Sequence, residues 1–236
     1  MYTYRDRVSY SRIDKNGLLG VSHVVDAMQD CCLFHSEDVG HSALDLLKKN
    51  RAWLVSSWHV VFKRRPKMGE RFAVHTWPYQ FRSIFGSRNF LMETDEHEVL
   101  AYADSQWFYF DSLTGQPAPV DREEKDAYPT EPAYEMEYKP RKVSCPADLT
   151  LVQKVDVCQN YLDTNNHVNN GQYIRLAVNV LPPDYEVGEL RAEFRRAAKM
   201  GDTMHIHTAR TSEHYYAVFT DAAGTPYFLS EFTECK

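Results

Sequence analysis

Residues 62–70 are FKRRPKMGE, and residues 194–202 are FRRAAKMGD. A histidine–threonine pair follows each stretch at the same offset, as His75-Thr76 and His207-Thr208. Similarity at this spacing indicates two copies of one unit and not a solenoid, because solenoid repeats have shorter periods. The sequence therefore predicts a tandem duplication.

The similarity extends upstream, where Asp14-Lys15-Asn16 corresponds to Asp163-Thr164-Asn165. In each copy a short strand leads into this Asp-x-Asn loop, and a helical pattern follows it. Several strand-like segments come next, rich in β-branched and aromatic residues and separated by turn signals. This order predicts an α+β fold, a tandem (double) hotdog in which each repeat is a long helix wrapped by a curved antiparallel sheet.

The predicted organisation has three parts. We expect an N-terminal hotdog repeat over residues 1–128, a linker over 129–150 and a C-terminal repeat over 151–236. The segment from Ser112 to Lys142 carries five prolines among many charges, which predicts an ordered surface linker without helix or strand. In the first repeat, we expect Ser22 to cap the helix and Gly40 to end it.

The composition excludes several classes of function. The chain has 236 residues, 43% of them hydrophobic and 25% charged, as in an ordinary globular protein. A net charge of −6 argues against nucleic-acid binding, which needs a basic surface. The five cysteines lack metal-type spacing, and no apolar stretch is long enough to span a membrane. We expect a soluble cytoplasmic protein in a reducing compartment.

The loop of the second copy carries the candidate chemistry. Asp163, Asn165 and His167 lie at i, i+2 and i+4, so in an extended or looped backbone their side chains could converge. A carboxylate, an amide and an imidazole suffice to hold a carbonyl, polarise it and activate a water. The alternative is structural, because Asn and Asp also form polar turns and cap helices.

Other clusters are weaker. His205 and His207 share one face of a strand, as metal ligands would, but no third ligand is evident and we favour a structural role. Basic residues gather at Arg64, Arg65 and Lys67, where they could dock an acidic partner. A solvated strand end is the alternative.

The second loop resembles a known family. Leu162 to Asn170, LDTNNHVNN, resembles the Asp-x-Asn-x-His-Val-Asn-Asn signature of acyl-(acyl carrier protein) thioesterases. The Glu193-to-Arg196 box, EFRR, is similar to that family's Glu-aromatic-Arg-Arg box. The first half of the chain also resembles the family, at Trp53-Leu54-Val55, Arg65-Pro66, Gly69-Glu70 and Thr76-Trp77. The resemblance covers nearly the whole chain and implies a double hotdog that hydrolyses the thioester between a fatty acyl chain and phosphopantetheine.

Two positions depart from the plant-type pattern. An acidic residue and a cysteine follow the Arg-Arg pair in that pattern, whereas Ala197 and Ala198 stand here. Neither a cysteine nucleophile nor a glutamate base is therefore available at this place. The chemistry is expected to rest on Asp163, Asn165 and His167. The start of the sequence shows no transit peptide, so we expect a bacterial enzyme and not a plastid one.

These observations predict a fatty acyl-carrier-protein thioesterase that needs no metal and no cofactor. We expect Val24, Met28 and Cys31 to line the acyl pocket, and the first copy to be silent because Leu18 stands where His167 does. Its substrate partner would be an acyl carrier protein, with nucleic acid and membrane excluded as partners and a homodimer left open. The alternatives are an acyl-CoA thioesterase, a hotdog dehydratase and a non-catalytic acyl-carrier binding protein.

Overall fold

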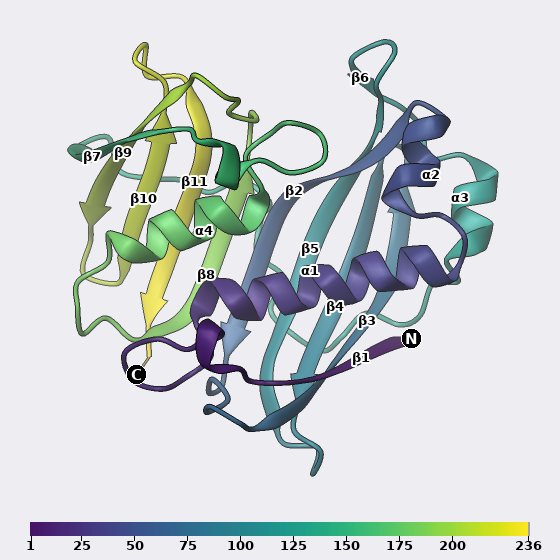
Figure 1. The fold of residues 1–236 in the computed structure, drawn as a ribbon, viewed down its shortest axis with the longest axis horizontal. Coiled ribbons are helices and arrows are strands. Elements are labelled where there is room, and N and C mark those ends of the chain that lie inside the picture. The colour runs from purple at the N-terminus through teal and green to yellow at the C-terminus, as the bar shows by residue number, and fades with distance from the viewer. Residues whose placement is uncertain (236) are drawn as a thin grey trace. The chain divides into compact units, whose positions relative to one another are not determined.

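A computed structural model describes residues 1–235, and they form two compact units. The first unit holds Met1–Ser56 and Val60–Lys139. The second holds Ser57–His59 and the chain from Pro140 onward. The boundary between the two units after Lys139 lies inside the segment that the sequence predicts as a linker. Figure 1 shows a long helix, α1, and a shorter one, α4, each lying across the strands of its own unit.

The first unit is a sheet with one long helix. Its elements are β1 (Tyr2–Arg7), α1 (Val21–Asp38), α2 (Ala43–Lys48), β2 (Arg51–Phe62), β3 (Arg71–Arg82), β4 (Phe85–Glu93), β5 (Val99–Asp111), β6 (Gln116–Pro117) and α3 (Arg122–Ala127), with a 3-10 turn at Tyr10–Arg12. The strand order is β1-β3-β4-β5-β2, β6 lies beside β5, and the successive pairs from β1 to β5 are antiparallel.

The second unit repeats this plan. Its elements are β7 (Thr150–Asp156), a 3-10 turn at Gln159–Tyr161, α4 (Asn170–Asn179), β8 (Val187–Phe194), β9 (Thr203–Arg210), β10 (His214–Thr220) and β11 (Pro226–Glu234). The strand order is β8-β11-β10-β9-β7, antiparallel throughout. The predicted α+β arrangement of one helix and an antiparallel sheet in each repeat is confirmed.

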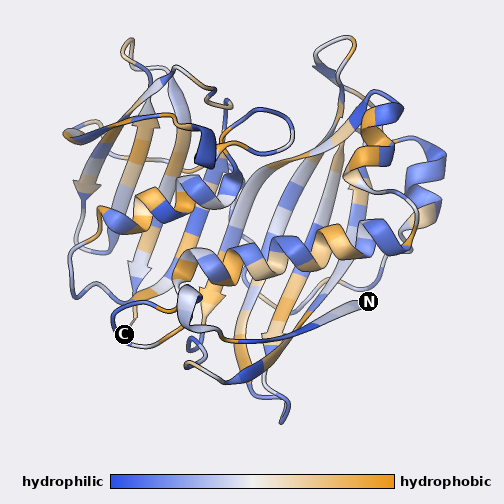
Figure 2. Ribbon diagram, in the orientation of Figure 1, coloured by the Kyte–Doolittle hydropathy of each residue, from blue (hydrophilic) through white to orange (hydrophobic). Residues whose placement is uncertain are grey.

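Each helix packs its apolar side on its sheet. In the first unit Met28 of α1, Phe72 of β3 and Phe90 of β4 are fully buried. In the second, Tyr173 of α4 stacks on Phe228 of β11 with ring centroids 5.4 Å apart. Figure 2 shows the alternation of apolar and polar residues along both helices. Such burial is the main stabilising contribution of a layered fold.

Three local predictions need correction. The helix α1 starts two residues earlier than a Ser22 cap requires, with Gly20 at the N-cap, and Ser22 is buried inside the first turn. The short helix α2 was not predicted. The segment after Ser112 contains a short strand, β6, and a short helix, α3. Asp121 caps α3, because its side chain accepts a hydrogen bond from the Glu124 N–H (2.9 Å). Gly40, at φ +76°, follows the end of α1 as expected.

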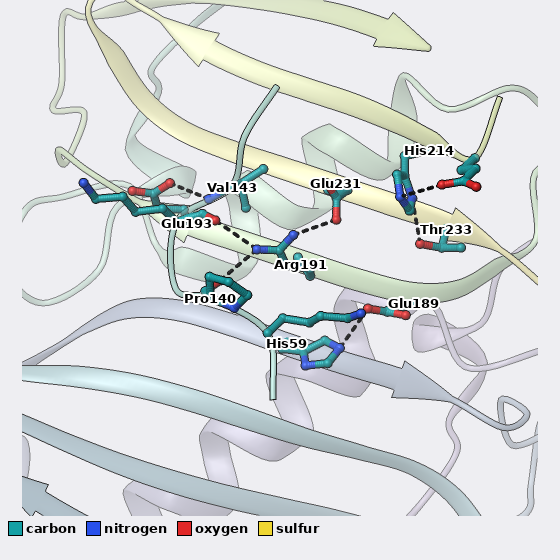
Figure 3. A network of polar contacts seen from close by, with 12 residues as sticks. His59, Pro140, Val143, Glu189, Arg191, Glu193, His214, Glu231 and Thr233 are labelled. Carbon is teal, nitrogen blue, oxygen red and sulfur yellow. Dashed lines mark hydrogen bonds and ion pairs between the residues drawn. The ribbon is translucent and has the colours of Figure 1, made fainter. Parts of the chain in front are cut away.

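The segment between the repeats is held by both units in turn. In the first unit, the Asn89 side-chain oxygen accepts hydrogen bonds from the Tyr134 N–H (3.0 Å) and the Tyr138 hydroxyl (3.1 Å). In the second, the buried carboxylate of Glu193 accepts the N–H of Val143 (2.9 Å). Figure 3 shows this contact within the polar network on β8 and β11. Glu193, from the EFRR box, therefore positions the linker.

Candidate active site

The second Asp-x-Asn loop is closed by its own backbone. The Asp163 N–H donates to the His167 carbonyl (2.7 Å), and the Asn166 N–H donates to the Asp163 carbonyl (3.0 Å). Asn166 has φ +57°, a left-handed conformation that asparagine tolerates better than most residues. One oxygen of the Asp163 carboxylate, Oδ1, accepts the N–H groups of Asn165 (2.8 Å) and His167 (3.2 Å). The carboxylate thus fixes the backbone that carries both other candidates.

The loop is also anchored to the chain that follows β8. The Val168 N–H donates to the Ala198 carbonyl (2.9 Å), and His167 forms a β-bridge with Lys199. The Ala198 N–H donates in turn to the hydroxyl of Tyr173, which is buried on α4 (2.8 Å). No pattern in the sequence indicated this hydrogen bond. It ties the loop to the helix that follows it.

Capping does not explain the three candidates. The cap of α4 is Asn169, whose side-chain oxygen accepts the Gly171 N–H (2.9 Å). Asp163 forms a polar turn, as the structural alternative proposed, but neither it nor His167 caps the helix. Asn165 is exposed, and within residues 1–235 the His167 imidazole has no hydrogen-bond partner. Both side chains are therefore available to another molecule.

The first loop is built in the same way. The Asp14 carboxylate oxygen Oδ1 accepts the N–H groups of Asn16 (2.8 Å) and Leu18 (3.2 Å), and Leu18 forms a β-bridge with Lys67. The Leu19 N–H donates to the Pro66 carbonyl (2.8 Å). The repeat alignment from the sequence thus holds at the level of individual hydrogen bonds.

The two loops differ in charge. In the first, the guanidinium of Arg65 donates to the second carboxylate oxygen of Asp14 and to the Leu19 carbonyl (3.0 Å). Burial opposes ionisation of Asp14, but Arg65 and the loop N–H groups outweigh it and lower its pKa. In the second loop Ala197 stands at the position of Arg65, and the second oxygen of Asp163 has no partner within residues 1–235. Only the second loop combines an imidazole with a carboxylate that lacks a guanidinium partner.

Comparison with known proteins identifies the family. The family model for the acyl-ACP thioesterase N-terminal domain, where ACP is acyl carrier protein, matches residues 1–128. The model for the C-terminal domain of the same family matches residues 147–224. The chain belongs to the acyl-ACP thioesterase family. The resemblance stated from the loop and the EFRR box is confirmed.

Individual relatives of this thioesterase-family chain are distant in sequence. It is 24% identical over 228 residues to the oleoyl-acyl carrier protein thioesterase 1 of Arabidopsis thaliana, a match that covers 85% of this chain and 61% of the relative. It thus spans less than two thirds of that relative's length. Its structure is similar to that of an acyl-ACP thioesterase from Bacteroides thetaiotaomicron (TM-score 0.89, 21% identity, 98% and 96% of the two chains).

A second solved structure, the 12:0-ACP thioesterase of Umbellularia californica, is similar to this chain with TM-score 0.85 and 19% identity, over 98% and 96% of the two chains. These likenesses cover both repeats and confirm the tandem hotdog fold. At such identities they inform the fold and not the residues of the site.

The two alanines that depart from the family pattern lie beside the candidate loop. Ala197 is exposed and Ala198 is buried, and both lie on the segment that anchors the loop. Neither methyl group can take a proton or attack a carbonyl. The assignment of the chemistry to Asp163, Asn165 and His167 stays a prediction.

The predicted acyl-pocket residues lie together on α1. Val24, Met28 and Cys31 are fully buried against the sheet of the first unit. The Cys31 thiol donates to the Val74 carbonyl of β3 (3.3 Å), and burial raises its pKa to about 12. Cys31 is therefore not a nucleophile near neutral pH. Their role in binding an acyl chain stays a prediction.

The predicted docking cations differ in availability. Arg64 donates to both oxygens of Glu70 and to the carboxylate of Glu98, and the Arg65 side chain is only 11% exposed against Asp14. Lys67 is exposed. Both arginines have partners within the chain, so Lys67 is the most accessible of the three cations for an acidic partner. Docking at these residues stays a prediction.

The histidine pair on β9 shows no ligand geometry. The His207 ring hydrogen-bonds to the Thr220 hydroxyl (3.2 Å), and burial together with His205 lowers its pKa. Among residues 1–235, no group of three or more His, Cys, Asp or Glu side chains is placed to hold a metal ion. In the same range, none of the helices is long and apolar enough to cross a membrane.

Proposed function

We propose that this chain hydrolyses fatty acyl thioesters of acyl carrier protein and releases free fatty acid. The supporting observation is the difference between two loops that share the same pattern of backbone hydrogen bonds. The first carries Leu18 and a carboxylate paired with Arg65, whereas the second carries His167 and a carboxylate without such a pair. Membership in the acyl-ACP thioesterase family supports the same activity.

In the proposed reaction a water oxygen attacks the thioester carbonyl carbon. The His167 imidazole takes the proton of that water, because histidine exchanges protons near neutral pH. The side-chain amide of Asn165 donates to the carbonyl oxygen as negative charge develops on it. The carbon–sulfur bond then breaks, and the imidazolium returns the proton to the departing pantetheine sulfur. Asp163 holds the loop and stabilises the transient positive charge on the imidazole.

We further propose that the carrier protein docks on exposed lysines beside the loops. Lys67 and Lys199 occupy equivalent repeat positions, and each forms a β-bridge with a loop residue, Leu18 and His167 respectively. Both lysines are exposed. An exposed cation next to the reactive loop suits an acidic carrier, because rim charges steer encounter and orientation.

Hydrolysis of a substrate panel tests the activity. The purified protein is given the same acyl chain on acyl carrier protein, on CoA and on short pantetheine, and thiol release is followed. We expect kcat/KM to be highest for the carrier-linked chain. A preference for CoA would favour the acyl-CoA thioesterase, and carrier binding without turnover would favour the non-catalytic protein.

Charge reversal tests the docking surface. Lys199→Glu and Lys67→Glu should lower kcat/KM for the carrier-linked substrate and leave short pantetheine thioesters almost unchanged. Lys154→Glu, at an exposed lysine of β7, is the matched control and should leave both unchanged. Equal losses on the two substrates would argue against a carrier contact at these lysines.

A further inference from the structure

A polar cleft lies in the first unit, where the edge strand β1 ends and β3 begins. Its volume is about 330 Å³, and the residues that line it are Arg7, Gly69, Glu70, Arg71, Asp95 and Glu96. Every lining residue is charged or is a glycine. A pocket for an apolar ligand has a mainly apolar lining, so this cleft suits a small polar molecule and not an acyl chain.

Two arginines of the cleft face each other across the two strands. Arg7 of β1 pairs in register with Arg71 of β3. Their side chains therefore leave the same face of the sheet, with Cβ atoms about 5 Å apart. Within residues 1–235 neither guanidinium has a carboxylate partner. Like charges directly opposite each other destabilise a strand pair, and an anion bound between them would remove that cost.

The second repeat has the same backbone frame at this place. The N–H of Val8 donates to the carbonyl of Glu70, and the N–H of Val157 donates to that of Asp202, both at 2.9 Å. The residues one place away on each strand, which are paired in register in both repeats, are therefore equivalent: Arg7 and Arg71 in the first, Asp156 and Thr203 in the second.

The pair in the second repeat is satisfied within the chain. The Thr203 hydroxyl donates to the Asp156 carboxylate (2.6 Å). Arg7 and Arg71 carry only donors, so no such hydrogen bond can form between them. One backbone frame thus holds a self-contained pair in one repeat and two unneutralised cations in the other. The frame does not require the two arginines, which is the observation that points to a ligand.

The two guanidinium groups present their donors to the cleft. Arg7 Nε donates to the Gly69 carbonyl (2.7 Å), which orients the planar fork and leaves its two terminal NH₂ groups without an acceptor within residues 1–235. Arg71 is exposed, and in the same range its side chain makes no hydrogen bond. Paired N–H donors of this geometry match the oxygens of a phosphate group.

Most carboxylates of the cleft are already paired. The two oxygens of Glu70 accept from Arg64 (2.7 and 3.1 Å), and Asp95 accepts from Arg5 (3.3 Å). The exposed carboxylate of Glu96 has no donor within residues 1–235. After the internal ion pairs, the cleft retains two positive charges and one negative charge. Free carboxylate oxygens accept hydrogen bonds, so Glu96 can bind a hydroxyl group of a ligand.

We propose that this cleft binds a small phosphate ester that carries hydroxyl groups, of the kind represented by glycerol 3-phosphate. Arg7 and Arg71 donate to the phosphate oxygens, and Glu96 accepts from a hydroxyl group. The site belongs to the first unit alone and does not rest on the proposed thioesterase activity.

Titration calorimetry with glycerol 3-phosphate and with inorganic phosphate tests the site. Low ionic strength is used, because salt screens exposed charges. We expect saturable binding of glycerol 3-phosphate to the parent protein, and weaker binding of inorganic phosphate. Arg71→Thr, which introduces the residue of the second repeat, should weaken the binding of both by roughly 10- to 100-fold, the effect of losing hydrogen bonds to a charged group.

Arg82→Thr is the matched control. Arg82 is an exposed arginine at the other end of β3, outside the cleft, and its loss should leave both affinities unchanged. Urea unfolding shows that each variant is folded. Without phosphate, Arg71→Thr should be at least as stable as the parent, because a like-charge pair is removed. Added glycerol 3-phosphate should stabilise the parent and not Arg71→Thr.

Glu96→Ala tests the hydroxyl contact. It should abolish the preference for glycerol 3-phosphate over inorganic phosphate and leave the binding of inorganic phosphate no weaker. The absence of saturable binding to the parent, or binding to Arg71→Thr as tight as to the parent, would overturn the proposal. Equal affinity of the parent for the two probes would overturn the hydroxylated ester as the ligand.

Discussion

Replacing the equivalent aspartates of the two loops, one at a time, should separate stability from catalysis. In Asp14→Asn the side-chain oxygen still accepts the loop N–H groups, but the new amide N–H₂ faces the guanidinium of Arg65. Two N–H donors then face each other, and the Arg65 guanidinium, which is only 11% exposed, loses its anionic partner. Breaking a fully buried pair costs about 3–5 kcal/mol. Because Asp14 is 28% exposed, we expect a loss of about 2 kcal/mol in the free energy of unfolding.

Asp163→Asn should have the opposite profile. Its Oδ1 accepts the same two backbone N–H groups, and Ala197 presents no cation to be left unpaired. Only the charge assistance of these hydrogen bonds is lost, which is worth about 1 kcal/mol. The turnover rate should nevertheless fall on the order of 10²-fold or more, because in the proposed mechanism the Asp163 carboxylate stabilises the imidazolium of His167.

Two measurements on the same preparations decide the matter. Urea unfolding gives the free energy of unfolding of each variant, and thiol release from a carrier-linked substrate gives its kcat. We expect the first-loop variant to be the less stable and the more active of the two. Comparable losses of kcat, or a nearly normal kcat in Asp163→Asn, would refute a single active site in the second repeat.

Three further outcomes are expected. His167→Ala and Asn165→Ala should each lower kcat on the order of 10²-fold with less effect on KM, and ordinary turnover in both would contradict the mechanism. Met28→Phe, at a fully buried site of α1, should shift the preference towards shorter acyl chains, as a chain-length panel would show. Hydrogen bonds from Arg64 lower the pKa of Glu70, so this pair stabilises the fold above the ordinary carboxyl pKa of about 4.3, and the contribution is lost as pH falls through the lower folded value. Glu70→Gln should therefore be less stable than the parent at pH 7, and a difference that persisted unchanged at acid pH would contradict this.

The repeat could be predicted because both copies carry the same short-range patterns. The order of strand, Asp-x-Asn loop, helix and strands is written in short-range patterns of hydrophobicity and turn residues. The loop geometry is local as well, since the Asp163 carboxylate reaches only the N–H groups two and four residues ahead. Such contacts follow from spacing alone. The short helices α2 and α3 carry too few residues to give a clear period, and they were missed.

The candidate site was only partly predictable. The sequence located Asp163, Asn165 and His167 and the substitution at Ala197. It did not reveal that Asn169 caps the helix in their place, because several side chains in an Asn-rich run compete for one cap. The sequence showed Arg64 and Arg65 only as part of a basic cluster. The fold pairs Arg64 with Glu70 and Glu98, and Arg65 with Asp14.

The sequence by itself determined the duplication, the element order and the residues of the candidate loop, because each can be read from short stretches of the chain. Only the tertiary structure decided which charges are neutralised and which are not. Arg7 and Arg71 lie on different strands, and only the pairing of these strands places the two cations opposite each other, without a carboxylate partner within residues 1–235. Pairing partners far apart in sequence set the burial and charge balance of a side chain, and no local pattern records them.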